Sequence, residues 1–222
     1  MSPALVALGL SLKVAGTAAA IDLVVGVALG WLLARRRFLG RELLDALLTL
    51  PMVLPPTVLG YYLLVLMGTH GPLGAWLLGT FGIRLLFTWP AAAVAAAVVA
   101  LPLVLKSARA AFEGVDPQLE RAARSLGLGE PAVFFRVTLP LAARGILAGE
   151  LLAFARALGE FGATLMVAGS IPGRTQTLSI AVYEAVQAGD DATANLLVGI
   201  TSLTCIVVLL LAGRLVPRGA LA

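Results

Sequence analysis

The sequence predicts an all-α integral membrane protein with about five transmembrane helices and a cytoplasmic loop of two short helices between the third and the fourth. Hydrophobic residues make up 60% of the chain and charged residues only 13%, with a mean hydropathy of +1.00, which is outside the range of ordinary soluble domains. The basic residues gather at the ends of apolar segments, as membrane topology requires. One charged stretch, residues 115–140, interrupts the apolar segments and must lie in water or against a soluble partner.

The reactive side chains argue against metal, redox and nucleic-acid chemistry. The single cysteine, Cys205, lies in an apolar run without a second cysteine to pair with, and the single histidine, His70, has no clustered metal ligands. The net charge of +4 is spread over segment ends rather than gathered in a patch that would bind nucleic acid. No period of about 20–50 residues recurs, so we expect one membrane domain over residues 1–222. Residues 1–12 lack a basic n-region, so we expect the first helix to be retained.

Five segments are long and apolar enough to cross a bilayer core of about 30 Å, which takes about 20 residues of helix. They are residues 10–34, 43–67, 89–111, 141–167 and 193–214. In the first, Lys13 is expected to be an interfacial anchor, while Asp22 lies too deep to face lipid and is expected to face other helices. The third is rich in alanine, which permits close helix approach.

The distribution of Lys and Arg orients these helices. Twelve of the sixteen fall on one side of the membrane, two (Arg84 and Arg174) on the other, and Lys13 and Arg156 lie in or at the edge of spans. The twelve are Arg35, Arg36, Arg37, Arg41, Lys106, Arg109, Arg121, Arg124, Arg136, Arg144, Arg214 and Arg218. Because basic loops stay in the cytoplasm, we expect a multi-pass protein of the inner or plasma membrane, with its N-terminus outside and its C-terminus in the cytoplasm.

The second span contains three prolines, Pro51, Pro55 and Pro56. Each removes a backbone donor and crowds the preceding turn, so the helix is expected to be kinked or briefly unwound. A broken membrane helix often lines a pathway, and a kink that only improves packing accounts for the prolines equally well. The Gly- and Pro-rich segment 68–88 is interpreted as an external loop with aromatic interface anchors.

The charged stretch is predicted to fold as two short helices. Asp116 is placed to cap the first, with Pro117 at its first position and Gly127 past its end. Helical spacing gives it a narrow apolar face opposite a polar one: Leu119, Ala122, Ala123 and Leu126 against Glu120, Arg121, Arg124 and Ser125. The second helix is predicted to begin at Pro131 and to break at Pro140. The narrow face suits a groove on another protein, although a loop resting on the membrane surface accounts for the same pattern.

The same stretch resembles the cytoplasmic loop of permease subunits of bacterial and archaeal ABC importers. That loop has the pattern EAA, three residues, Gly, nine residues, Ile, one residue, Leu-Pro. The corresponding residues here are Arg121-Ala122-Ala123, Gly127, Val137 and Leu139-Pro140. The sequence departs from the pattern at Arg121, where the family has Glu, and at Val137, where it has Ile, and Glu120 lies one residue earlier. Segments 10–16, 50–64 and 154–178 resemble the molybdate or tungstate branch of these permeases, and the last is also similar to sulfate and thiosulfate permeases.

The resemblance implies the transmembrane subunit of an importer that moves molybdate or tungstate into the cytoplasm by alternating access. Its implied partners are a second copy of itself, two cytoplasmic ABC ATPase subunits, an external oxyanion-binding protein and membrane lipid. Residues 112–140 would then be a coupling loop that docks into a cleft of the ATPase. The residues expected to couple are Asp116, Leu119, Glu120, Arg121, Ala122, Ala123, Leu126, Gly127, Leu139 and Pro140.

The chain itself is not expected to be an enzyme or to bind a cofactor. It has no GxxxxGK[ST] motif, so ATP and Mg²⁺ are expected on the partner ATPase. Three alternatives to the molybdate reading remain: a sulfate or thiosulfate permease, a membrane-embedded lipid-modifying enzyme, and a membrane scaffold protein. The enzyme would need a metal motif or nucleophile that the sequence lacks, and a scaffold would need neither a kinked second span nor a Gly-rich fourth.

The fourth span carries charges that need compensation within the membrane. Arg156 and Glu160 are spaced i, i+4 and are expected to form a structural ion pair, in preference to direct contact with an oxyanion, which a bare carboxylate would repel. Its glycines leave small surfaces for close helix crossing or for a narrow path. The candidate pathway or gate residues are Pro55, Pro56, Gly159, Glu160, Gly162 and Thr164. The polar segment 168–192 either contacts an oxyanion or is an external loop that receives the binding protein.

Overall fold

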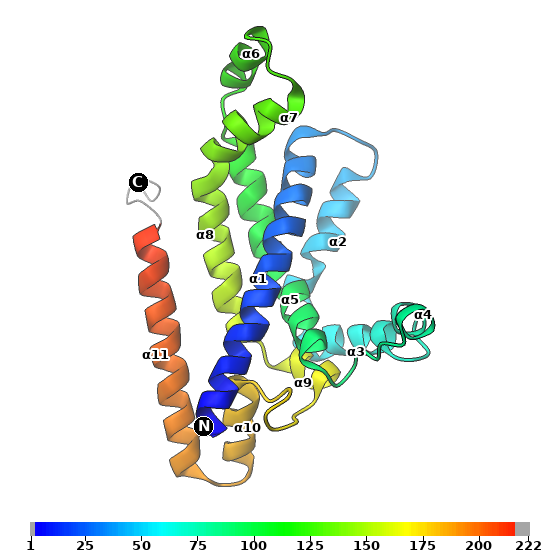
Figure 1. The fold of residues 1–222 in the computed structure, drawn as a ribbon, viewed down its shortest axis with the longest axis vertical. Helices are drawn as coiled ribbons and strands as arrows, with labels where there is room; N and C mark the ends of the chain where they lie inside the picture. Colours follow the sequence, from blue (N-terminus) through cyan, green and yellow to red (C-terminus); the bar gives the residue numbers. More distant parts are fainter. Residues whose placement is uncertain (1–2, 216–222) are drawn as a thin grey trace.

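The computed structural model describes residues 3–215, which form helices joined by short loops, with no strand among them. Figure 1 shows α1, α5 and α8 running side by side along the long axis, with α6 and α7 at one end and α10 at the other. The elements are α1 (Pro3–Arg35), α2 (Arg41–Val53), α3 (Pro56–Met67), α4 (Pro72–Phe81), α5 (Trp89–Glu113), α6 (Pro117–Ser125), α7 (Glu130–Val133), the π-helix η1 (Phe134–Thr138), α8 (Leu139–Leu158), α9 (Gly162–Ala168), α10 (Leu178–Gln187) and α11 (Asp191–Leu215).

Five stretches of the described chain are long and apolar enough to cross a membrane. They are Pro3–Arg35, Pro56–Phe81, Trp89–Glu113, Glu130–Leu158 and Asp191–Leu210. The all-α class and the number of spans predicted from the sequence are therefore confirmed. Arg218 and the C-terminus, whose side of the membrane the sequence predicted, lie outside the described residues.

Helix α5 forms the core with α1 and α8, because small residues let the three helices approach closely. A Cβ added at Gly30 of α1 would lie 2.9 Å from the Cβ of Ala108 of α5, and one at Gly145 of α8 would lie 2.7 Å from the Cβ of Ala111. No larger residue fits at either glycine unless the helices separate. Asp22 is buried within this core, as the prediction that it faces other helices requires.

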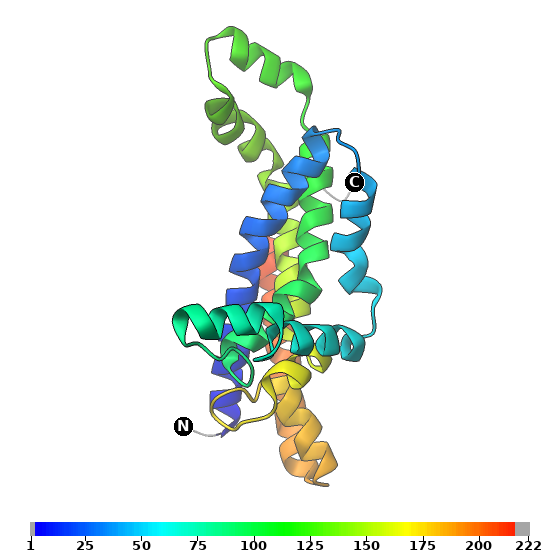
Figure 2. The ribbon, with the colours of Figure 1, turned by 90° about the vertical axis from the view of Figure 1, so that its right-hand side faces the viewer.

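The second predicted span is not one continuous helix. α2 ends at Val53, Leu54 is extended with φ −67° and ψ 140°, and α3 begins at Pro56. The residue before a proline is driven away from the helical region, and Pro55 and Pro56 both lack an N–H donor, so the helix cannot continue here. Of the two predicted outcomes, the chain takes the unwound one. Figure 2 shows α3 and α4 lying across the direction of α2.

Segment 68–88, predicted to be an external loop, and segment 168–192, predicted to be either an external loop or a contact for the oxyanion, both contain helices. In segment 68–88, α4 begins at Pro72 and is followed by Gly82 in the left-handed conformation, with φ 69°. The Pro and Gly that indicated a loop are thus the start and stop signals of a short helix. In segment 168–192, residues 178–187 form α10. The glycines and prolines of the first segment and the polar residues of the second hid helices too short to be recognised by their apolar length.

The fourth predicted span, 141–167, is wrong at both ends. The helix starts earlier, because α7, η1 and α8 follow one another without a gap from Glu130, and Pro140 does not break it. The N–H of Leu139 donates to the carbonyl of Phe134, five residues back, and this π-turn accommodates a proline that has no N–H of its own. At the other end α8 stops at Leu158, and three residues separate it from α9.

Helices α10 and α11 form a hairpin at the end of the molecule opposite α6 (Figure 1). The N–H of Leu178 donates to Oγ of Ser11 at 2.7 Å and so ties α10 to α1. Asp190 caps α11, because the N–H of Thr193 donates to its Oδ1 at 3.0 Å, and the hydrogen bonds from Thr193 lower the pKa of Asp190. From Asp191 to Leu210, α11 lies at the edge of the bundle with most of its apolar side chains exposed.

Candidate functional site

Helix α6 begins and ends where the sequence predicts. The N–H of Gln118 donates to Oδ1 of Asp116 at 2.8 Å, which caps the helix, and Pro117 takes its first position. Gly127 follows the last turn with φ 88°, a left-handed conformation that glycine adopts without strain. The chain turns there toward α7, so Gly127 forms the predicted elbow between the two short helices.

The exposed face of α6 differs in part from the predicted one. Leu119 and Leu126 are 48% and 85% exposed, and Arg121 and Ala122 are exposed beside them. Ala123, which the sequence placed on the same apolar face, is buried. Two exposed leucines on a short polar helix form a small apolar surface of the kind that a partner protein covers.

Glu120, which the sequence left free for an outside contact, points into the protein. Its Oε1 accepts from Nη2 of Arg35 at 2.6 Å and from Oγ1 of Thr138 at 2.7 Å. Nη2 of Arg124 lies 3.8 Å from its Oε2, and Arg124 also donates through Nε to Glu130 at 2.7 Å. Because Arg35 ends α1 and Thr138 ends η1, Glu120 ties α6 to both. Charge-assisted hydrogen bonds of this kind are among the strongest that side chains form.

Sequence reasoning missed both partners of Glu120. Arg35 lies 85 positions before it and was counted only among the residues that set topology. Thr138 lies between two residues of the loop pattern and has no distinguishing feature of its own. Glu120 itself gave no signal, because helical spacing places it on the polar face with Arg121, Arg124 and Ser125.

Leu139 and Pro140, also predicted to couple, lie at the junction of η1 and α8 rather than on α6. Leu139 packs against the buried cluster that contains Phe112 and Ile146, while Pro140 is exposed. These two residues therefore belong to the helix that connects the elbow to the fourth span, and not to the exposed face.

The two helix breaks meet in space. A Cβ at Gly162, which begins α9, would lie 2.8 Å from the Cβ of Pro56, which begins α3. Pro55 and Gly159 are exposed at the two breaks. Non-helical backbone at membrane depth is tolerated where it is buried in protein or lines a cavity. The structure thus brings together predicted pathway residues from two spans that are far apart in sequence.

Glu160 and Thr164, also predicted to lie on a pathway, are buried at 3% and 1% exposure and face no open path. Oε2 of Glu160 lies 2.8 Å from Nη1 of Arg156, so the predicted ion pair is present. Oε1 accepts from the N–H of Ala163 at 2.9 Å and so caps α9. The pair therefore bridges the break between α8 and α9 instead of lying along one helix, and Glu160 supports the break from inside.

Residues 26–220 match the model of the family described as binding-protein-dependent transport system inner membrane component. The chain belongs to this family. It is therefore an inner-membrane transport component, and the prediction that it is a transport subunit rather than an enzyme is confirmed.

Several curated relatives are similar over most of the chain. The molybdenum transport system permease protein ModB of Escherichia coli (strain K12) is 50% identical over 189 residues, 84% of this chain and 82% of that protein. The putative molybdenum transport system permease protein YvgM of Bacillus subtilis (strain 168) is 43% identical over 185 residues, 83% of this chain and 82% of that protein. The sulfate transport system permease protein CysT of Escherichia coli (strain K12) is 38% identical over 172 residues, 78% of this chain and 62% of that protein.

Solved structures share the fold at low sequence identity. A bacterial ABC transporter involved in the import of alginate has a TM-score of 0.79 and 14% identity, covering 99% of this chain and 81% of that chain. The MetNI methionine ABC transporter, in an inward-facing conformation, has a TM-score of 0.71 and 17% identity, covering 95% and 93%. Together with the curated relatives, these structures confirm the resemblance to ABC importer permeases that the loop pattern implied.

Proposed function

We propose that this chain is the transmembrane subunit of an ABC importer that carries molybdate or tungstate into the cytoplasm. The observation that carries the proposal is the 50% identity to a molybdenum permease over 84% of the chain, against 38–40% to two sulfate permeases over 78–80% of it. The geometry supports it, since the exposed face of α6 offers a contact for a cytoplasmic partner and the two helix breaks offer a place where spans move apart.

The importer contains two copies of this chain, two cytoplasmic ATPase subunits and an external oxyanion-binding protein. Five spans are too few to enclose a path alone, whereas a two-fold dimer places two α6 helices beneath the membrane, one for each ATPase. A transporter of the same fold, with a TM-score of 0.77, has been solved in complex with a periplasmic protein bound to its alginate ligand. The N-terminus lies outside and α6 in the cytoplasm, as the distribution of basic residues indicates.

Transport follows from how α6 is held. ATP and Mg²⁺ bind the ATPase pair, and its closure draws the two α6 helices together through Leu119, Leu126 and the residues exposed beside them. Glu120 fixes α6 to α1 through Arg35, so movement of α6 passes to the spans. The spans then switch from facing inward to facing outward, the binding protein delivers the oxyanion, and hydrolysis restores the inward-facing state.

Uptake of radiolabelled oxyanions by proteoliposomes that contain the purified complex tests this function. We expect ATP-dependent uptake of molybdate and tungstate about tenfold faster than of sulfate, a difference of about 1.4 kcal/mol. A complex with a hydrolysis-deficient ATPase subunit is the control and should transport none of them. Faster uptake of sulfate would support the sulfate importer instead, and a stable complex that takes up no oxyanion would reject the proposal.

A further inference from the structure

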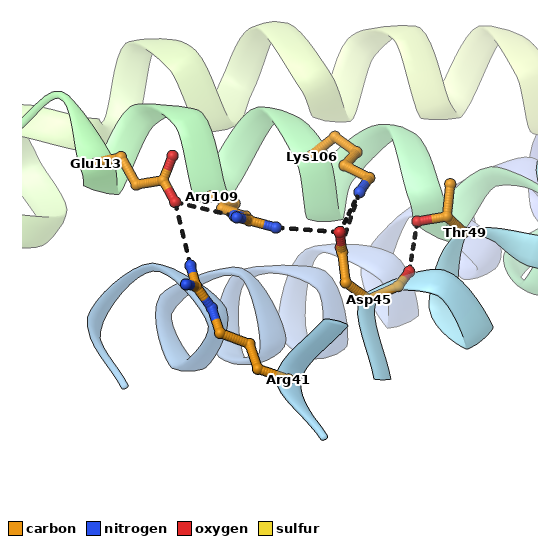
Figure 3. A network of polar contacts seen from close by, with 6 residues as sticks. All are labelled: Arg41, Asp45, Thr49, Lys106, Arg109 and Glu113. Carbon is orange, nitrogen blue, oxygen red and sulfur yellow. Dashed lines mark hydrogen bonds and ion pairs between the residues drawn. The ribbon is translucent and has the colours of Figure 1, made fainter. Parts of the chain in front are cut away.

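Helix α2 is attached to the rest of the protein mainly through charge. All thirteen of its residues are described and none is buried. At the spacing i, i+4, i+8, Arg41, Asp45 and Thr49 share one face, and Figure 3 shows this face turned toward Lys106, Arg109 and Glu113 of α5. We call these six residues the α2–α5 seam. Partly exposed ion pairs contribute little to stability, so α2 separates from α5 more readily than the apolar core helices separate from each other.

Within the seam, Asp45 forms ion pairs with two cations of α5. Nζ of Lys106 donates to its two carboxylate oxygens at 2.8 and 2.7 Å, and Nη1 of Arg109 donates to Oδ2 at 3.1 Å. Arg109 also donates through Nε to Oε1 of Glu113 at 2.9 Å, and Nη2 of Arg41 lies 3.5 Å from the same Oε1. Donors that converge on one carboxylate would converge equally well on the oxygens of a small oxyanion.

The seam borders a cavity of about 860 Å³ whose lining has an excess of positive charge. Four cations line it, namely Arg37, Arg41, Lys106 and Arg109, against the two carboxylates of Glu42 and Asp45. Glu113 beside the lining pairs with Arg41 and Arg109, so one positive charge remains in excess. With Asp45 displaced the excess becomes two, which matches the charge of a dianion.

A second, smaller cavity of about 170 Å³ lies farther along the same two helices, beside the break in the second span. Its lining includes Pro51 of α2, Leu103 of α5, Pro56 at the break, and Arg156. Leu103 and Lys106 are three residues apart, about 4.5 Å along the helix axis, so the two cavities are neighbours on α5. Each cavity therefore has a cation in its lining, and the one at the helix break, Arg156, is paired with Glu160.

We propose that the α2–α5 seam is the inner half of the oxyanion path, in which Lys106 and Arg109 contact the oxyanion and Asp45 occupies their donors between transport events. This inference rests on the proposed function and adds a binding site to it. A dianion must displace Asp45 to reach Lys106 and Arg109, so the carboxylate keeps the site weak. Weak holding suits a conduit, since the substrate has to leave.

Equilibrium binding of radiolabelled molybdate to the complete complex, in nanodiscs without nucleotide, tests the site. Asp45→Asn removes the competing carboxylate, and we expect binding about five- to tenfold tighter than wild type, within the usual range of coupling between competing interactions. Glu42→Gln is the matched control, because it removes the same charge from the same helix and cavity. Glu42 forms no ion pair within residues 3–215, so we expect a change below about twofold.

A double variant separates contact with the anion from pairing with Asp45. If Lys106 only neutralised Asp45, then Lys106→Gln added to Asp45→Asn would leave the tighter binding intact. We expect the double variant to bind about fivefold more weakly than Asp45→Asn, because a cation that contacts the anion is lost. In uptake assays, Lys106→Gln should slow molybdate transport about fivefold, while Lys106→Arg, which keeps the charge, should retain most of it.

Equal affinities for Asp45→Asn and Glu42→Gln, or a double variant that binds as tightly as Asp45→Asn, would overturn the proposal, and the cluster would then serve only to fasten α2. Should the Asp45→Asn complex fail to assemble, the Lys106→Gln variant alone decides, because Arg109 still pairs with Asp45 and holds α2 in place. Uptake by Lys106→Gln at the wild-type rate would also overturn the proposal. If instead the proposed function is wrong, the wild-type complex itself imports none of the oxyanions, which distinguishes this outcome from a failure of the binding site alone. If wild type imports sulfate instead, the same variants are measured with sulfate.

Discussion

At the scale of single residues, Glu120 and Arg121 have exchanged the roles that the family pattern suggests. The pattern has an acid at the position of Arg121, whereas here the acid lies one residue earlier and faces inward. Glu120 is paired with Arg35, whose side chain is 22% exposed, whereas Arg121 is exposed. The acid therefore holds the helix to the protein, and the outward surface of α6 carries a positive charge instead of a negative one.

Glu120→Gln keeps the size of the side chain and removes its charge. We expect the free energy of unfolding of the purified permease to fall by about 1–2 kcal/mol, since a hydrogen bond to a charged group contributes about that much. Partial exposure of Arg35 spares it the full cost of an unpaired buried charge. Arg121→Gln is the matched control, and its change should stay within about 0.5 kcal/mol because the residue is exposed. Thermal unfolding in detergent measures both, and equal losses would contradict the inward role of Glu120.

At the scale of elements, α6 and α7 are two short helices joined by a glycine elbow, and the second runs directly into the fourth span. Gly127 has φ 88°, and nothing lies within 4 Å of a Cβ added there, so its constraint comes from the backbone alone. Gly129, two residues later, has φ −71°, a conformation open to any residue. A side chain at Gly127 would therefore strain the backbone, whereas one at Gly129 would not, so substitutions at these two glycines can be compared within one loop.

Gly127→Val should uncouple transport from ATP hydrolysis. A β-branched residue in the left-handed region costs about 1–2 kcal/mol, which the loop relieves by changing the angle between α6 and α7. We expect molybdate uptake per ATP hydrolysed to fall about fivefold or more, in line with a perturbation of about 1 kcal/mol. Gly129→Ala, the control, should leave this ratio unchanged. Uptake and hydrolysis are measured together in proteoliposomes, and a normal ratio for Gly127→Val would argue against α6 as the coupling element.

How far the sequence predicted these elements depends on whether their signals are local. Asp116, Pro117 and Gly127 specify α6 within a dozen residues, and the prolines at 55 and 56 specify the break in the second span. The break after Leu158 has no proline, and its cap, Glu160, was interpreted as half of an ion pair on a continuous helix. Contacts between distant positions, such as Arg35 with Glu120, depend on tertiary packing, which spacing along one chain does not reveal.

At the scale of the whole molecule, the chain divides into a tightly packed centre and a loosely attached periphery. The centre consists of α1, α5 and α8, whose glycines leave no room between backbones. The periphery consists of α2, which buries no side chain, and of α11, most of which is exposed at the edge of the bundle. The apolar side chains that these two helices expose require lipid or a second copy of the chain to cover them.

The predicted orientation of the whole molecule is tested with single cysteines at its two ends, in a Cys205→Ser background. Ser125 on α6 and Ala188 after α10 are both exposed. We expect a membrane-impermeant maleimide to label Ala188→Cys in right-side-out vesicles and Ser125→Cys only in inside-out vesicles stripped of the ATPase. The comparison of the two vesicle preparations is its own control, because each cysteine is labelled in one of them. The reverse pattern would place the N-terminus inside.

The close packing of α1 and α8 on α5 also sets the size of the motion that the molecule can transmit. Helix α5 has 25 residues and is therefore about 37 Å long. A Cβ added at Gly26, Gly30 or Gly145 would lie within 3 Å of a side chain of α5. Because the three helices pack this closely, we expect them to tilt together. A tilt of about 5° at the α6 end then displaces the far end by about 3 Å, by simple geometry on that length. A displacement of this size is comparable to the width of a water molecule, so we expect a small rotation at the α6 end to open or close a narrow passage at the opposite end of the molecule.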